Sequence, residues 1–179
     1  METIDNSNTT VTTHIVKGLI LSAFSIIFSV VMYVFNLFEY SWLTWVSTAV
    51  VMAGIIYGNI LYANQNNNNV TFGNLFAHGF KTTAVIIVIT TAYTLLAFKV
   101  LFPDMIDIIL EISRKQMLEN PKMTDEMIEQ AISMTKKFFI PFAIGGTILG
   151  TGFAGAIASL IGAGVAKKNP LDPFSNPAS

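Results

Sequence analysis

The hydrophobic positions of this chain fall into four long stretches, at about residues 18–38, 40–63, 82–102 and 138–166. Only Lys99, near the end of the third stretch, carries a charge, and its long side chain can reach the lipid headgroups from there. A bilayer core about 30 Å thick is crossed by about 20 apolar residues in a helix, because lipid offers the backbone no hydrogen-bonding partner. The pattern therefore predicts an all-α, polytopic membrane protein with four transmembrane helices.

The third and fourth stretches are separated by a charged segment, residues 103–137. Of the 21 charged side chains in the chain, 13 lie between residues 99 and 137. Apolar residues recur there at helical spacing on both sides of Asn120-Pro121, which should break a helix, and Thr124 is a suitable N-cap for a second one. We expect an amphipathic helical hairpin outside the membrane, inserted between the third and fourth transmembrane helices.

Together these segments predict one membrane domain covering residues 1–179, with a polar N-terminal tail at residues 1–13. The first two helices are joined by a few residues around Glu39, so they should pair in an antiparallel fashion. Thr71 is a suitable N-cap. The three phenylalanines that follow it at every fourth position predict a helical lead-in at the membrane interface, ahead of the third transmembrane helix.

Composition excludes several other classes of protein. Charged residues make up 12% of the chain, against about 25% in a soluble domain, and a soluble four-helix bundle would need a charged outer face on every helix. A net charge of -1 gives no basis for binding nucleic acid. Without cysteine the chain can form neither a disulfide nor a thiolate zinc site. The partner that composition itself indicates is the lipid bilayer.

The fourth stretch carries an unbroken row of small residues. As one straight helix its 29 uncharged residues would reach about 44 Å, more than a bilayer core requires, so we expect a kink at Pro141. In lipid, rows of small residues allow helices to approach closely. The surface facing this row could belong to the same chain, to a second copy or another subunit, or to a pore. We call the row the small-residue ridge: Gly146, Gly150, Ala154, Ala158, Gly162 and Ala166.

The predicted spans offer little chemistry. Apart from Lys99 at one edge they contain no Asp, Glu, Lys, Arg or His, although coupled transporters and proton relays place such residues at mid-membrane. An intramembrane protease would need paired carboxylates, a Ser-His couple or a metal site. The glycines of the fourth stretch follow no strand and precede no lysine, unlike a phosphate-binding loop. We therefore predict no catalytic residue, no metal and no cofactor.

Two small constellations remain. Asp104, Asp107 and Glu111 are spaced i, i+3, i+7, so in a helix they would share a face just outside the membrane. Such a face could hold Mg²⁺ beside a lipid phosphate, or it could simply be solvated, or form part of an interface. His14 and His78 could meet on the side of the membrane where the two termini lie.

The distribution of basic residues between the two sides of the membrane indicates the orientation of the chain. Four of them lie on the side of the termini and six on the side of the charged segment, which by count favours a cytoplasmic hairpin. Against this count, Lys17 precedes the first helix and no basic residue lies in the turn that follows it, and early helices often dominate. We predict cytoplasmic termini. The four residues on their side are Lys17, Lys81, Lys167 and Lys168.

Several short motifs occur along the chain: Phe72, Gly73, Phe76, Gly79, Phe80 and Lys81; Phe102-Pro103-Asp104; Ser159-Leu160-Ile161 in a Gly-rich last helix; and Lys167-Lys168. Through these motifs the chain resembles a known family, the domain of unknown function 4199. The resemblance runs from about Lys17 to Asp172-Pro173. It implies a small bacterial inner-membrane protein with four spans, and it brings no catalytic residues. Because such genes lie near membrane glycosyltransferases, it also implies an accessory role in a lipid-linked sugar pathway.

Two functions follow as hypotheses. The first is a non-catalytic integral membrane subunit or scaffold that docks another membrane protein, or a second copy of itself. The alternative is an oligomeric channel or facilitator for a small solute, suggested by the glycines of the last helix. An enzyme acting on a lipid phosphate with a metal at Asp104, Asp107 and Glu111 is a weaker third idea.

Overall fold

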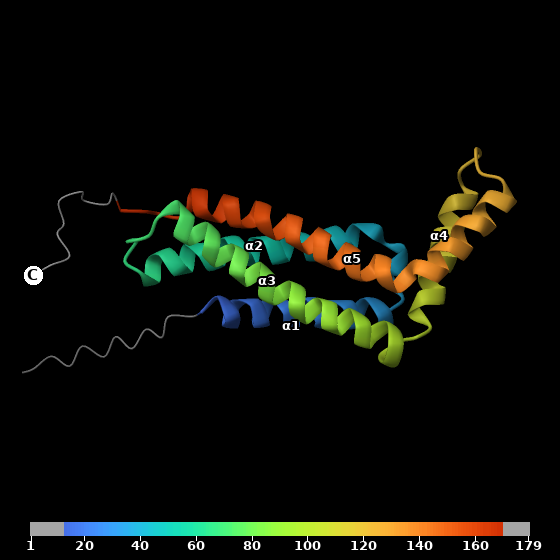
Figure 1. Ribbon diagram of the computed structural model, residues 1–179, viewed down its shortest axis with the longest axis horizontal. Helices are drawn as coiled ribbons and strands as arrows, with labels where there is room; N and C mark the ends of the chain where they lie inside the picture. Colours follow the sequence, from blue (N-terminus) through green and yellow to red (C-terminus); the bar gives the residue numbers. More distant parts are fainter. Residues whose placement is uncertain (1–12, 170–179) are drawn as a thin grey trace, which may run out of the picture.

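The computed structural model describes residues 13–169, and this part of the chain is almost entirely helical, with no β-strand (Figure 1). The predicted polar tail, apart from Thr13, lies outside the described residues. In chain order the elements are α1 (His14–Val34), η1 (Leu37–Glu39), α2 (Ser41–Gln65), α3 (Phe72–Leu96), the π-helical turn η2 (Ala97–Leu101), α4 (Met105–Leu118) and α5 (Asp125–Val165).

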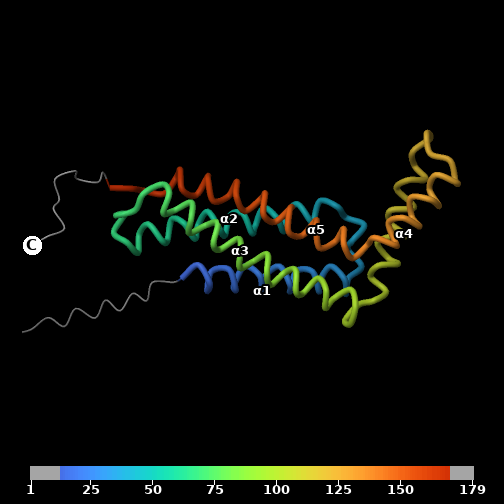
Figure 2. Tube along the Cα trace, in the orientation of Figure 1, coloured from blue at the N-terminus to red at the C-terminus, as the bar shows by residue number. Residues whose placement is uncertain are grey.

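Four of these helices run side by side as one bundle (Figures 1 and 2). The most extensive pairing is that of α3 with α5; α1 packs on α3, and α2 packs on α5, whereas the consecutive helices α1 and α2 touch little. Both ends of the described chain lie at one end of the bundle, and α4 lies at the opposite end, where it leans away together with the start of α5 (Figure 1). We call these the terminal end and the α4 end.

The prediction of four membrane-spanning helices is confirmed. Each of α1, α2, α5 and the continuous α3–η2 helix is long and apolar enough to cross a bilayer. Their outer surfaces carry large apolar side chains such as Trp45 and Leu149, each 74% exposed, which is the surface expected to face lipid. The chain is therefore a multi-pass helical membrane protein.

Two helices begin earlier than the apolar stretches predicted. Helix α1 starts at His14 rather than near residue 18, and α3 starts at Phe72 rather than near residue 82. The expected lead-in is thus the first part of α3 itself. The predicted N-cap is confirmed, since the Thr71 hydroxyl accepts a hydrogen bond from the Asn74 N–H at 3.1 Å. As a consequence Lys17 and His78 lie within spanning helices, where the sequence placed no such group.

The second half of the expected hairpin and the fourth transmembrane helix are a single helix, α5, of 41 residues. Thr124 caps it as predicted, accepting from the Met127 N–H. Its kink lies at Phe138, with φ −107° and ψ 15°, three residues before the expected position. Pro141 remains the cause, because a proline lacks the N–H for the carbonyl four residues earlier and its ring clashes with that carbonyl, on Lys137.

Replacing Pro141 with alanine should straighten α5, because alanine restores the missing N–H and removes the clash. As the chain has no cysteine, spin labels can be placed at Gln130→Cys and Val165→Cys alone. A straight helix would separate these positions by about 53 Å. Double electron-electron resonance should give a shorter distance for the native chain and one close to that value for Pro141→Ala; equal distances would contradict this origin of the kink.

At the α4 end, α4 packs on the first turns of α5. The contact is a small core made of Leu110, Ile128, Ile132 and Phe139. Arg114 donates to both carboxylate oxygens of Glu129 across this contact, and the carboxylate raises the pKa of Arg114. We call α4 and residues 125–137 of α5 the elbow.

Candidate functional site

A buried cluster of polar side chains lies near the terminal end of the bundle. The Lys17 ammonium donates to the Gly58 carbonyl at 3.0 Å and lies 3.1 Å from Nε2 of His78. Lys17 is only 8% exposed and His78 only 6%. Because an ammonium can only donate, Nε2 accepts, which places the ring proton of a neutral His78 on Nδ1.

Aromatic contacts hold the imidazole in place. The His78 ring stacks on the Tyr62 ring, with centroids 4.1 Å apart and planes at 18°. His14 meets His78 edge-on at 6.1 Å, so the two histidines come together at the terminal end as the sequence allowed. The Lys17 ammonium also lies 5.8 Å from the centre of the Tyr62 ring, within the range of a cation–π interaction.

A second group of contacts joins α2 to α5 beside this pair. Asn59 is fully buried, and its Nδ2 donates to the Ser159 carbonyl at 3.3 Å. The Ser159 hydroxyl donates to the Gly155 carbonyl at 2.6 Å. A Cβ on Gly79 would lie 2.7 Å from Ser159 Oγ, and one on Gly162 would lie 2.7 Å from Asn59 Nδ2. These glycines are therefore required by the close approach of three helices.

We call Lys17, Asn59, Tyr62, His78 and Ser159 the polar cluster. No salt bridge to Lys17 occurs among residues 13–169, so the ammonium is balanced by a carbonyl, an imidazole and an aromatic face alone. Ionisable groups are expensive within membrane helices and usually mark functional positions. Here Lys17 and His78 join α1, α2 and α3, and the hydrogen bond from Asn59 to Ser159 adds α5, so the cluster holds these four helices together near the terminal end.

Sequence reasoning missed Lys17, Asn59 and Ser159 as members of a site. One signal was available: His14 and Lys17 are three residues apart, so they share a helix face once the helix is extended back to His14. The motifs of the family resemblance carried a second signal, because Gly79 and Ser159, which belong to two of them, meet in this cluster.

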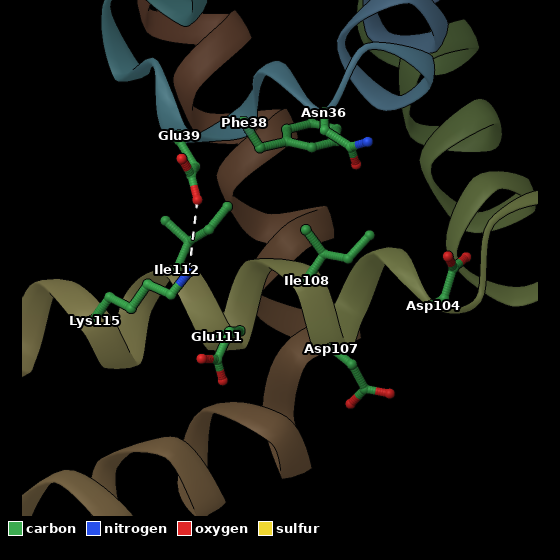
Figure 3. Close-up of a pocket in the computed structure, with 9 residues that line it drawn as sticks. All are labelled: Asn36, Phe38, Glu39, Asp104, Asp107, Ile108, Glu111, Ile112 and Lys115. Atoms are coloured by element: carbon green, nitrogen blue, oxygen red, sulfur yellow. Dashed lines mark ion pairs between the residues drawn. The ribbon is translucent and has the colours of Figure 1, made fainter.

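The three predicted acids lie at the α4 end, around a groove of about 600 Å³ between α4 and the turn that contains η1 (Figure 3). The Tyr33 hydroxyl lies 2.9 Å from both carboxylate oxygens of Asp104, which share its one proton, and Asp107 pairs with Lys136 at 2.8 Å. Asp107 and Glu111 point away from the η1 turn, whereas the Asp104 carboxylate, at the start of α4, points to the opposite side of this helix (Figure 3). The structure thus does not aim the three carboxylates at one point.

Two isoleucines and one ion pair form the rest of this groove. Ile108 and Ile112 point towards Phe38 of η1 (Figure 3). Lys115 pairs with Glu39 at 3.7 Å, joining the two sides. Within the described range, residues 13–169, no group of three or more His, Cys, Asp or Glu is placed to hold a metal ion.

The small-residue ridge on α5 divides into two halves. Ala158, Gly162 and Ala166 are buried against the chain's own helices. Gly146 and Gly150 are exposed, and a Cβ on either would meet nothing within 4 Å, while Ala154, between the two halves, is partly buried. The C-terminal half of the ridge therefore packs within this chain, and its N-terminal half, Gly146 and Gly150, is open.

These features define a helical membrane protein in which buried polar groups connect the four helices of the bundle. Residues 17–168 match the model of the family described as "Protein of unknown function (DUF4199)". The match covers most of the chain, which therefore belongs to this family. No curated protein and no solved structure matches the chain.

Proposed function

We propose that this protein is a non-catalytic membrane subunit that docks a second membrane protein, or a second copy of itself, against the open half of the small-residue ridge. The observation that carries the proposal is the space over Gly146 and Gly150. Exposed glycines on a membrane helix let the backbone of another helix approach closely. Beside them Phe142 and Leu149, 65% and 74% exposed, offer apolar side chains to pack on both sides of the approaching helix.

The elbow supports the same proposal. Its residues 125–137 lie on the same helix, α5, as the open half of the ridge, and the elbow extends beyond the bundle (Figure 1). A partner on the ridge could therefore also contact the charged surface of the elbow. Asp104 and Asp107 are already bound to Tyr33 and Lys136, and these contacts favour a structural role over metal-dependent chemistry on a lipid phosphate.

The partner we propose is a membrane glycosyltransferase of a lipid-linked sugar pathway, on the strength of the family's associations alone. We also propose the bacterial inner membrane as its location, with cytoplasmic termini. A channel through a single chain has little support, because the polar cluster and the close helix contacts at Gly79 and Gly162 fill the bundle near the terminal end. An oligomeric channel would therefore have to pass between copies.

Photo-crosslinking in native membranes tests the docking proposal. With benzoylphenylalanine at Leu149, next to the open ridge, we expect one discrete adduct, whose mass distinguishes a second copy from a different protein. Adding Gly146→Leu should abolish that adduct, because the leucine would occupy the space that the partner backbone needs, while the bundle stays folded.

The matched control places the same crosslinker at Val88 of α3, which is 68% exposed on another helix. It should give no discrete adduct, and Gly146→Leu should not alter its pattern. An identical adduct from both positions, or an adduct at Leu149 that survives Gly146→Leu, would count against docking on the ridge.

A further inference from the structure

A cavity of about 700 Å³ lies inside the bundle, in the half nearer α4. All four bundle helices contribute to its wall. Ile55 and Ile86, which are 2% and 1% exposed, lie at its deep end and separate it from the terminal end. The cavity is therefore closed in the direction of the polar cluster and does not form a continuous path through the bundle.

The wall is rich in hydroxyl groups but contains no formal charge. Ten of its twenty residues are serine, threonine or tyrosine, and none is Asp, Glu, Lys, Arg or His. Its other residues are apolar side chains and glycines. A charged ligand would leave its ion without a counter-charge in a region of low dielectric constant, at high cost. The wall thus favours an uncharged molecule with a large apolar part.

The hydroxyl groups are arranged mainly as acceptors. Thr48, Thr90 and Thr94 donate their protons to carbonyls of their own helices at 3.0, 2.7 and 2.8 Å, which leaves oxygen lone pairs free. Tyr93 and Ser29 differ, because their oxygens are 3.5 Å apart, too long for a strong O–H···O hydrogen bond. Either hydroxyl can turn towards a ligand, so the wall can both donate to and accept from an oxygen group.

The cavity opens sideways between α2 and α5. Trp45 of α2 and Phe153 of α5 line it, yet they are 74% and 72% exposed, so they lie at its mouth. Gly150 also lines the cavity, and no atom lies within 4 Å of where its Cβ would be. The mouth therefore faces the hydrocarbon of the bilayer, from which a lipid chain can enter without crossing water.

We propose that this cavity binds an uncharged lipid, an acyl chain that ends in a hydroxyl or ester group such as that of a monoacylglycerol. The volume lies in the range of pockets that hold small organic ligands. Tyr93 and Ser29 bind the oxygen group of the lipid, and the apolar residues contact its chain. Gly150 belongs both to this site and to the open half of the ridge, but binding of a lipid inside the cavity does not require a docked partner.

Tryptophan quenching tests the site, because Trp45 lies at the mouth while the nearby Trp42 does not line the cavity. These are the two tryptophans of the chain. Each is kept alone, in Trp42→Phe and in Trp45→Phe, and titrated in nanodiscs with dibromostearoyl glycerol. We expect saturable quenching of Trp45 that unbrominated monooleoylglycerol reverses, and only weak, non-saturating quenching of Trp42.

Two comparisons define the chemistry. The anion dibromostearate should bind at least tenfold more weakly than the glycerol ester, because it carries a charge. Tyr93→Phe, which removes one hydroxyl and keeps the ring, should weaken the glycerol ester about tenfold. Equal, non-saturating quenching of both tryptophans would mean that the brominated lipid only dissolves in the bilayer. Loss of Trp45 quenching when two copies of the chain associate would mean that the second copy, not a lipid, occupies the mouth. Either result, equal binding of the anion, or no effect of Tyr93→Phe overturns the proposal.

Discussion

Gly155→Leu is expected to lower the stability of the bundle by about 3 kcal/mol or more. A Cβ at this position would overlap the side chain of Thr83, where α5 meets α3 in the most extensive helix pairing. Thr83 cannot easily move aside, because it is β-branched, 1% exposed, and donates from its hydroxyl to the Gly79 carbonyl at 3.0 Å. The two helices would have to separate.

The measurement is the melting temperature of the purified protein in a mild detergent, followed by its retention on a size-exclusion column. A loss of about 3 kcal/mol corresponds to a decrease of about 6–12 °C in a chain of this size. Gly164→Leu is the matched control, since it lies on the same helix, is exposed, and a Cβ there would meet nothing within 4 Å. Similar melting temperatures for the two variants would show that α3 and α5 are not closely packed at Gly155.

The features that could be predicted from the sequence are those with local causes. Long apolar stretches require helices in lipid, and Thr71 and Thr124 cap their helices through hydrogen bonds to residues three positions away. The kink follows from Pro141, whose ring acts on the preceding turn, and this explains why the distortion appears at Phe138 rather than at the proline itself.

The helix bounds at the terminal end could not be predicted in the same way. The apolar stretches begin after Lys17 and after His78 and Lys81, so an apolar count alone placed Lys17 and His78 outside the spans. Their burial depends on the Gly58 carbonyl and the Tyr62 ring, which belong to α2 and become neighbours only when the bundle assembles. The spacing of His14 and Lys17 within α1 indicates that they share a face, but not which groups of α2 that face meets.

The small-residue ridge shows the same limit. The row itself is visible in the sequence because it repeats every four residues. Which half is occupied depends on where α2 crosses α5, and that crossing is fixed by Asn59 and Ser159, 100 positions apart. The sequence left all three uses of the ridge open, and the structure accounts for Ala158, Gly162 and Ala166, which are buried within the chain.

Asn59→Asp tests that crossing by exchanging one amide N–H₂ for an oxygen of nearly the same size. The carboxylate would face the Ser159 carbonyl, an acceptor, in a fully buried position. The Lys17 ammonium is already bound to the Gly58 carbonyl and to His78, and residue 59 is turned about 100° from residue 58 around the helix. An uncompensated buried charge of this kind costs about 3–5 kcal/mol.

The sign of the pH effect distinguishes this cause from a general loss of packing. A protonated carboxyl can donate to the Ser159 carbonyl as the native amide does, so the melting temperature of Asn59→Asp relative to the native chain should rise as the pH falls from 8 to 5. Asn64→Asp, an exposed position on the same helix, should show neither the loss nor this recovery. An equally large loss at both pH values would mean that the Asn59–Ser159 hydrogen bond does not hold α2 against α5.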